Sequence, residues 1–272
     1  MSRFDFFQVE RDEERRIATL FLNRPEARNA MNWPFWRDLP LVVDELEADD
    51  AIRAVVVAAH GKSFSTGLDI VSFFDDFGHL VQAENGDRRV ELRDLIVQMQ
   101  SGLNRIATGR KVYVAAIHRH CIGGALDLIA ACDIRLASKD ASFSLREAKV
   151  AIVADMGSLN RLPGIIGMGN TKLMALTGDD FSAEEARQMQ LVSRVYDDQP
   201  AVLEAARELA ASIAANPRLA VQGTKEVLRY VQDHSEQDGL QHVLLFNTAF
   251  IDSLDLREMG AAFKERRRPR FQ

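Results

Sequence analysis

Two glycine-containing loops in this sequence follow apolar runs and have the residues needed to bind an anion. The run 54–59 leads into residues 61–69, GKSFSTGLD, and the run 112–117 leads into Cys121-Ile122-Gly123-Gly124. A glycine pair lets a ligand approach the backbone, and the N–H of Gly124 begins an expected helix, where the helix dipole favours negative charge. This is half of an oxyanion hole. The alternative is a plain tight turn whose glycines are needed for packing.

Three carboxylates follow the second loop, and each has an alternative role without chemistry. Asp127 lies in the first turn of the helix expected after the glycines, where an acid complements the dipole. Glu147 could be an exposed partner of Arg146 or Lys149, and Asp155 could cap the helix that follows it. Asp155, however, comes directly after the mostly apolar run VAIVA, where an unpaired carboxylate is costly and its pKa rises. The acids are therefore candidates for proton transfer.

Several familiar motifs are absent from the sequence. It contains no G-x-G-x-x-G, no G-x-x-x-x-G-K-[ST], no C-x-x-C pair and no G-x-S-x-G. His118 and His120 leave one face of an extended strand together, as two metal ligands would. No acidic residue near them in the sequence completes a ligand set, so we expect polar residues at a strand end and no metal.

Apolar runs alternate with helical patterns through the first two thirds of the chain. Strands separated by helices imply crossover connections and an α/β core. The expected strands are 17–22, 54–59, 112–117 and 134–137, and the helical patterns include 35–46, 90–106 and 125–131.

The character of the sequence changes after residue 181. Ser182 and Glu185 have the spacing of a capping box, so a helix begins there. Apolar residues then recur at helical spacing until Asn216-Pro217 ends the run, and two or three more amphipathic helices fill the remainder. We therefore expect a core over residues 1–200 and a helical region over residues 201–272.

Length and composition indicate an ordinary globular protein. The chain has 272 residues, of which 27% are charged and 47% hydrophobic, and its net charge is 34 − 40 = −6. This length predicts one large domain, with or without a smaller appendage. The cysteines Cys121 and Cys132 could form one bridge at most, which fits a reducing compartment.

Targeting signals are not found at either end of the sequence. The first 16 residues have no apolar signal core, and the final letters PRFQ are not a peroxisomal signal. The longest apolar runs are far shorter than the roughly 20 residues of a membrane helix. A cytoplasmic location without membrane association is expected.

Five segments together resemble the crotonase (enoyl-CoA hydratase/isomerase) superfamily over essentially the whole chain. They are LNRPEARNAMN, GKSFSTGLDI, HCIGGALDLIAACDIRLAS, LREAKVAIVADMGSLNRLP and FSAEEARQMQLVSRVY. The resemblance implies an α/β fold, a crotonase-like spiral of ββα units with a C-terminal helical region used for oligomerisation into homotrimers or homohexamers. It also implies an acyl-CoA thioester as substrate and no cofactor, because coenzyme A is part of that substrate.

The resemblance also implies roles for individual residues. The N–H groups of Leu68 and Gly124 would form the oxyanion hole. Hydratases carry glycine where this chain has Asp155, whereas the set Asp127, Glu147 and Asp155 is similar to that of the dienoyl-CoA isomerases. The substrate-binding residues would be Ser65, Thr66, Gly67, Leu68, Asp69 and Gly124.

The predicted reaction is conversion of a 3,5-dienoyl-CoA to a 2,4-dienoyl-CoA in fatty acid beta-oxidation. A proton must leave carbon 2 and another must reach carbon 6, a span that one carboxylate does not easily cover. We therefore expect Glu147 to be the base at carbon 2 and Asp155 the acid at carbon 6. Asp127 would tune the protonation of the pair.

Two alternatives remain open from the sequence. One is an enoyl-CoA hydratase that adds water to a 2-enoyl-CoA with Glu147 and Asp127. The other is a non-catalytic oligomer that binds CoA esters or RNA through the basic tail 264–270, KERRRPR, and Arg119. Nucleic acid binding is not expected, because all three acids are in place. Arg119 and His120 stand where the family usually has small residues and would flank the acyl pocket.

Overall fold

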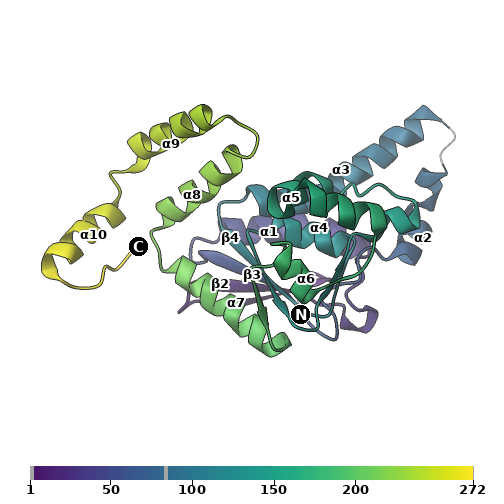
Figure 1. Cartoon of the computed structure of the whole chain (residues 1–272), viewed down its shortest axis with the longest axis horizontal. Coiled ribbons are helices and arrows are strands. Elements are labelled where there is room, and N and C mark those ends of the chain that lie inside the picture. The colour runs from purple at the N-terminus through teal and green to yellow at the C-terminus, as the bar shows by residue number, and fades with distance from the viewer. Residues whose placement is uncertain (1–2, 83–84, 272) are drawn as a thin grey trace.

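The computed structural model describes residues 3–82 and 85–271 and contains two sheets with helices packed around them (Figure 1). Within these residues the larger sheet has six strands in the order β1-β2-β3-β4-β6-β9. β1 is antiparallel to β2, and the later neighbours are parallel. The strands are β1 (Phe7–Asp12), β2 (Ile17–Leu22), β3 (Ala54–Ala59), β4 (Val112–Ile117), β6 (Ile134–Ser138) and β9 (Arg194–Tyr196).

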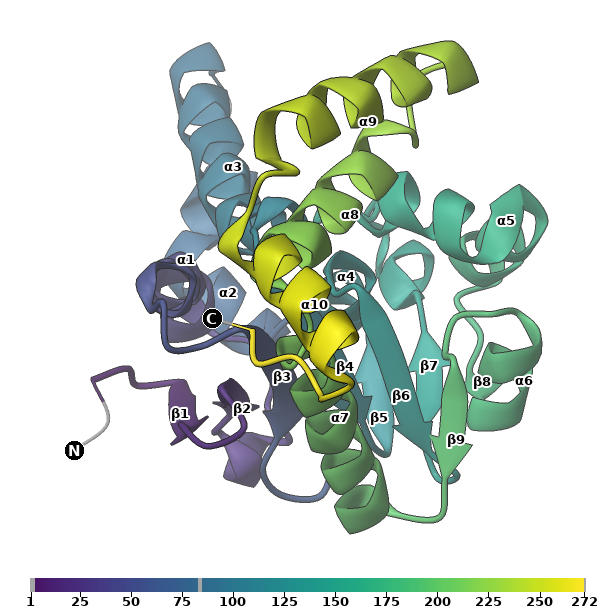
Figure 2. The same cartoon turned by 90° about the vertical axis from the view of Figure 1, so that its left-hand side faces the viewer.

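A smaller sheet lies beside the larger one (Figure 2). In the described chain its order is β5-β7-β8, with β5 parallel to β7 and β7 antiparallel to β8. Because β5 begins only three residues after β4 ends, the smaller sheet fixes the glycine loop that follows β5. Its strands are β5 (His120–Ile122), β7 (Ser142–Ser144) and β8 (Phe181–Ser182).

The central strands are buried on both faces, which explains why they read as continuous apolar runs. Every residue of β2, β3 and β4 is buried. Alternate residues enter two different cores, as Val55 and Val56 do on β3. The strands expected at 17–22, 54–59 and 112–117 are confirmed, and the fourth extends one residue further, to Ser138. The α/β fold class is therefore confirmed.

Helices cover both faces of the larger sheet (Figures 1 and 2). α1 buries an apolar side against α3 on one face, and α7 packs Val202, Ala206 and Ala210 on the other. The helices expected at 35–46, 90–106 and 125–131 are confirmed with longer bounds, and the capping box of Ser182 and Glu185 is confirmed. The helices are α1 (Trp33–Ala48), α2 (Ile70–Val81), α3 (Gly86–Thr108), α4 (Gly124–Ala131), α5 (Ser158–Thr177), α6 (Ala183–Gln188) and α7 (Gln199–Ala214), with short 3-10 turns η1 (Pro25–Ala27) and η2 (Arg146–Val150).

The C-terminal helices α8 (Arg218–Tyr230), α9 (Glu236–Phe250) and α10 (Leu254–Glu265) confirm the expected helical region (Figure 1). α8 is tied to the core by Lys225, whose Nζ lies 2.9 Å from Asp133 Oδ2. α7 packs on the sheet, so the helices that extend beyond it begin at α8. The division between residues 200 and 201 stays a prediction. The predicted core includes residues 1, 2, 83 and 84, and the predicted helical region includes residue 272, all of which lie outside the described chain.

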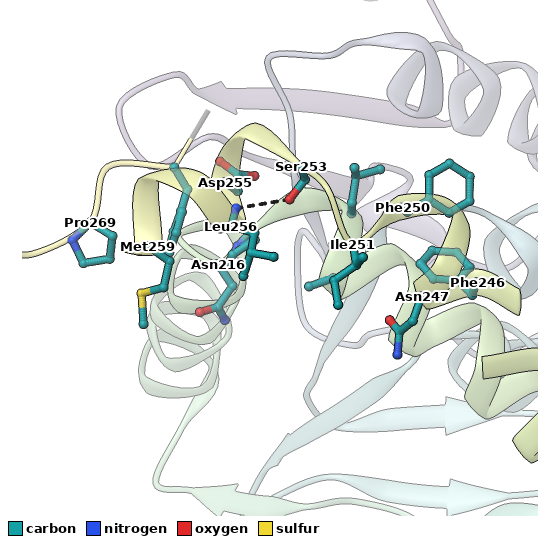
Figure 3. Close-up of a pocket in the computed structure, with 14 residues that line it drawn as sticks. Asn216, Phe246, Asn247, Phe250, Ile251, Ser253, Asp255, Leu256, Met259 and Pro269 are labelled. Atoms are coloured by element: carbon teal, nitrogen blue, oxygen red, sulfur yellow. Dashed lines mark hydrogen bonds between the residues drawn. The ribbon is translucent and has the colours of Figure 1, made fainter. Parts of the chain in front are cut away.

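A pocket of about 420 Å³ lies among the C-terminal helices (Figure 3). Its lining includes Phe246, Phe250, Leu256 and Met259 and contains none of the predicted site residues. In the same region Arg267 of the basic tail pairs with Glu258 and Glu265. The cationic tail is therefore partly neutralised within its own chain. Among the described residues, no helix combines the length and the apolar character that crossing a bilayer requires.

Candidate active site

The first predicted loop is held in place by its own serine. Ser65 is fully buried, its Oγ donates to the carbonyl oxygen of Asn29 over 2.7 Å, and it accepts the N–H of Gly67 over 3.1 Å. The N–H of Ser65 donates to the carbonyl oxygen of His120 over 2.8 Å, which joins this loop to β5. The buried side chain of Ser65 thus stabilises the loop through these hydrogen bonds, whereas Thr66 is half-buried.

Gly67 brings the two loops into contact. Its φ is +81°, and an added Cβ would lie 2.4 Å from the carbonyl oxygen of Ile122 and 3.3 Å from the nitrogen of Gly124. Next to it, the N–H of Leu68 has no acceptor among the described residues, although those of Gly67 and Asp69 are both bonded. The structure thus places Gly67, the residue before Leu68, directly against Gly124.

Gly124 is the first residue of α4, where backbone N–H groups lack intrahelical acceptors and the dipole is positive. The preceding Gly123 has φ +56°, and its N–H donates to Ser144 on β7 over 2.9 Å. Two adjacent N–H groups fixed in this way can stabilise a developing oxyanion. The oxyanion hole of Leu68 and Gly124 stays a prediction.

Replacing Gly67 with alanine is expected to distort this contact. The added methyl group would overlap the carbonyl of Ile122 at a backbone conformation that alanine rarely adopts. Strain of about 1–3 kcal/mol should lower the melting temperature by about 2 °C or more. Thermal unfolding measures this, with Gly86→Ala as the control because no described residue lies within 4 Å of its added Cβ. Equal melting temperatures for the two variants would contradict the packing described for Gly67.

Asp127 is the most buried of the three predicted acids. It is 1% exposed, and its Oδ1 accepts the backbone N–H of Ser158 over 2.6 Å. Burial raises its pKa to about 6, while hydrogen bonding to Ser158 acts in the opposite direction. Although Asp127 lies in the first turn of α4, its carboxylate binds the N-terminus of α5. It therefore does more than complement the dipole of its own helix.

Glu147 lies on η2, directly against the second glycine loop. An added Cβ on Gly123 would be 3.0 Å from Glu147 Oε1, so glycine is what allows the carboxylate this close. Its Oε2 is buried and has no hydrogen-bond partner in the described chain. Burial, together with the charges of Asp127 and Asp155, raises its pKa to about 7. A carboxyl with this pKa can exchange protons near neutral pH.

The alternative role of Glu147 as a surface ion-pair partner is wrong. Arg146 pairs with Asp180, and Lys149 pairs with Asp179 at 2.7 Å. The two cations that flank Glu147 in the sequence are thus turned toward other acids, and Glu147 is left facing the loop.

Asp155 is more open than the other two acids. Its side chain is exposed in the single chain, yet enough protein surrounds the carboxylate to raise its pKa, and its charge acts on both Asp127 and Glu147. Its carbonyl oxygen accepts Gln100 Nε2 of α3 over 2.5 Å. The three acids therefore form one electrostatic group, with Asp155 at its open side.

One alternative role of Asp155 is wrong, whereas the direction expected for its pKa, a rise, is confirmed. It does not cap the following helix, because α5 begins at Ser158 with Gly157 at the N-cap. The apolar run before it is not a buried segment of this chain, since Ile152 is 44% and Val153 is 76% exposed. Sequence hydrophobicity predicted burial there, whereas this turn projects from the surface.

The other predicted site residues have structural partners. Asp69 caps α2 by accepting the N–H of Ser72 and pairs with Arg24 at 2.6 Å, which lowers its pKa. Its carboxylate thereby orients the first loop, and its binding to substrate stays a prediction. His118 Nε2 lies 3.1 Å from the carbonyl oxygen of Gly61.

His120 Nδ1 lies 2.9 Å from Ser63 Oγ, so both histidines have polar partners at the strand ends. Within the described residues no three histidine, cysteine or acidic side chains are grouped as a metal site would require. His120 also lines a pocket of about 350 Å³ with Arg28, Thr66 and Arg146. Arg119 lies outside that pocket, exposed and with φ +55°.

The contributions of Ser158 and Arg161 were not predicted from the sequence. Ser158 binds Asp127, and the charge of Arg161 is close enough to lower the pKa of Asp127. The motif GSLNRLP after Asp155 contains both residues, but their contacts cross from α5 to α4 and leave no local spacing signal.

The pH dependence of stability follows from the two raised pKa values. The pKa of Asp127 rises from 3.8 to about 6 and that of Glu147 from 4.5 to about 7, so each holds a proton in the folded state after the unfolded chain has lost it. Their stabilising contribution is full below about pH 4 and is lost as the pH rises through about 7.

Urea unfolding at about pH 5 and about pH 8 tests this with the double variant Asp127→Asn/Glu147→Gln. Its loss of stability between these pH values should be smaller than that of the natural chain, by on the order of 2 kcal/mol. An identical pH dependence in the two proteins would contradict the raised pKa values.

Comparisons with known proteins agree with this fold. A model of the family described as enoyl-CoA hydratase/isomerase matches residues 12–272. A Dictyostelium discoideum protein named Delta(3,5)-Delta(2,4)-dienoyl-CoA isomerase, mitochondrial, is 38% identical over 269 residues, which cover 99% of this chain and 92% of that protein. The peroxisomal protein of the same name from Arabidopsis thaliana is 36% identical and is matched over 97% of this chain and 95% of its own.

A solved structure is also similar over nearly the whole chain. The crystal structure of an enoyl-CoA hydratase from Bacillus anthracis has a TM-score of 0.87 at 26% identity and covers 98% of this chain and 99% of its own. The α/β arrangement with C-terminal helices is thus the crotonase fold. The chain belongs to the enoyl-CoA hydratase/isomerase family.

Proposed function

We propose that this chain is an isomerase that converts a 3,5-dienoyl-CoA to the 2,4-dienoyl-CoA during fatty acid beta-oxidation. The observation that carries the proposal is the third carboxylate, Asp155, beside the pair Asp127 and Glu147. Relatives at 36–38% identity that carry this activity in their names support it. Members of the family act on acyl-CoA thioesters, and the proposed reaction needs no further cofactor.

In the proposed reaction each acid and each amide has a separate part. Ionised Glu147 removes a proton from carbon 2, and the resulting negative charge collects on the thioester oxygen, where the N–H groups of Leu68 and Gly124 stabilise it. Protonated Asp155 delivers a proton to carbon 6, so the double bonds move from positions 3 and 5 to positions 2 and 4. The proton on Glu147 then passes through solvent to Asp155, which restores both groups.

Basic residues beside the first loop support a coenzyme A substrate. Arg28 lines both the pocket of about 350 Å³ and a neighbouring one of about 480 Å³ that also includes Lys62 and Arg119. Burial and nearby cations lower the pKa of His120, so these three side chains carry the positive charge. They suit the phosphates of coenzyme A better than the tail does, because Arg267 is already paired.

The direct test is a substrate panel with the purified protein. A 3,5-dienoyl-CoA should give growing absorbance of a conjugated thioester, and 3-enoyl-CoA and 2-enoyl-CoA should react more slowly. No conversion of the 3,5-dienoyl-CoA at high protein concentration would remove the proposal. Hydration of a 2-enoyl-CoA as the main reaction would favour an enoyl-CoA hydratase, which the closeness of Asp127 and Glu147 supports as the second candidate.

We also propose that the chain forms a homotrimer or homohexamer through its C-terminal helices. Large apolar side chains are exposed there, including Leu240 at 62% and Phe263 at 82%. Light scattering after size-exclusion chromatography measures the assembly, and a monomer would contradict it.

Several relatives are named as mitochondrial or peroxisomal, whereas the cytoplasmic location of this chain stays a prediction.

A further inference from the structure

The N-terminus of α5 is completed by a carboxylate from another helix. Its N-cap, Gly157, has no side chain to accept a hydrogen bond from the first turn. Asp127 of α4 supplies the acceptor, with its Oδ1 2.6 Å from the backbone nitrogen of Ser158. The helix dipole and this hydrogen bond both favour the ionised form of Asp127.

The hydroxyl of Ser158 is a buried polar group whose role the other described residues do not explain. Ser158 is 0% exposed, and its Oγ has no hydrogen-bond partner of normal geometry there. It nevertheless lies close enough to Asp127 to favour the charged carboxylate and lower its pKa. Buried hydroxyl groups are normally paired, so an unpaired one beside the predicted acids requires an explanation. Glu147 Oε2 is a second buried, unpaired oxygen in this acid group.

The charges around Asp127 act in opposite directions. Asp155 disfavours its ionisation, whereas Arg161 of α5 favours it. Cys121 on β5 is also near, but burial raises its pKa and keeps the thiol neutral. The groups that keep Asp127 charged therefore come from α5.

We propose that Ser158 is a positioning residue for the reaction. Its N–H fixes Asp127, and in the substrate complex its hydroxyl donates a hydrogen bond to the ionised Asp127 carboxylate. Asp127 then keeps the negative charge that makes Glu147 a stronger base. This inference rests on the proposed isomerase function for its kinetic consequences, but the link between Ser158 and Asp127 is independent of any substrate.

Ser158→Ala tests the link in the resting protein. Loss of a hydrogen bond to a charged group should raise the pKa of Asp127 by about one pH unit. Carbon-13 NMR of side-chain carboxyls measures this, with the Asp127 signal assigned by its loss in Asp127→Asn. Ser138→Ala is the matched control, because Ser138 is equally buried but bonds Ile117 and Asp140 at the end of β6.

The kinetic test separates positioning from a purely structural role. Near pH 7 an Asp127 whose pKa has risen by about one unit is only about half ionised. Its weaker charge lowers the pKa of Glu147 and weakens it as a base, so kcat of Ser158→Ala at about pH 7 should fall about threefold. KM should stay within about twofold, and the acidic limb of the kcat/KM profile should move to lower pH, because Glu147 then ionises earlier. Ser158→Thr keeps the hydroxyl and should restore both kcat and the pH profile.

Three outcomes would overturn the inference. They are an unchanged Asp127 titration in Ser158→Ala, an unchanged pH profile, or equal loss of kcat in the alanine and threonine variants when both melt like the natural chain. If the protein does not isomerise dienoyl-CoA at all, the proposed function fails, while the NMR titration still decides whether Ser158 controls Asp127.

Discussion

Replacing Asp155 with asparagine is expected to abolish dienoyl-CoA isomerisation while leaving the fold intact. Asparagine keeps the size of the side chain but cannot deliver a proton to carbon 6. A positioned acid typically contributes about 10²–10⁴ in rate, so kcat should fall by that factor. Stopped-flow absorbance of the conjugated thioester measures the loss, and exchange of the carbon 2 proton with deuterated solvent shows whether Glu147 still acts.

The exposure of Asp155 makes this variant a clean test. Its side chain is exposed and makes no ion pair in the described chain, so the melting temperature should be unchanged. Asp87→Asn, an exposed acid on α3, is the control for loss of one negative charge. We expect carbon 2 exchange to continue in Asp155→Asn without formation of the 2,4-dienoyl product. A fully active Asp155→Asn protein would exclude Asp155 as the acid.

The central strands could be predicted because burial acts on every residue in them. β2, β3 and β4 lie between two layers of helices, so selection for apolar residues is continuous and their bounds are visible in the sequence. β7 and β8 are only three and two residues long, and β5 is three. Such segments are positioned by contacts with distant chain, and no periodic pattern can develop over so few residues.

Those parts of the candidate site that depend on a single local feature of the sequence could be predicted. Glycine at 67 and 123 meets a backbone requirement that the sequence reveals, because each adopts a positive φ at a close contact. The role of Ser158 was not predictable, since its bond to Asp127 joins residues 31 apart in the sequence and uses a backbone N–H. The alternative role of Glu147 failed because Arg146 and Lys149 pair with other acids. That of Asp155 failed because α5 begins at Ser158 with Gly157 at the N-cap.

The coupling of the acids gives each of them a different part in the proposed reaction. Asp127 is fully buried but held at a helix N-terminus, Glu147 is half-buried with an unpaired oxygen, and Asp155 is open. Burial alone would make the most buried acid the one with the highest pKa. Instead the pKa is about 6 for Asp127 and about 7 for Glu147, because α5 stabilises the charge of Asp127. This order fits the proposed role of Glu147 as the base.

Replacing Glu147 with glutamine is therefore expected to remove activity toward every acyl-CoA that must lose a proton at carbon 2. Glutamine fills the same space beside Gly123 but cannot accept that proton, so kcat should fall by about 10²–10⁴. Unlike Asp155→Asn, this variant should also lose exchange of the carbon 2 proton with solvent. The two roles are separated if Glu147→Gln loses both proton exchange and product formation. Asp155→Asn should lose product formation alone.

The same variant tests the coupling within the acid group. Glu147 keeps its proton until about pH 7, so Asp127 with a pKa of about 6 ionises first, and carboxyl NMR should find the Asp127 titration nearly unchanged in Glu147→Gln. Glu13→Gln, an exposed change in the turn after β1, is the control and should alter neither activity nor the Asp127 titration. Retention of solvent exchange at carbon 2 in Glu147→Gln would assign the base to another residue. Asp127 would then be the first to examine, because its carboxylate is buried and its charge acts on Glu147.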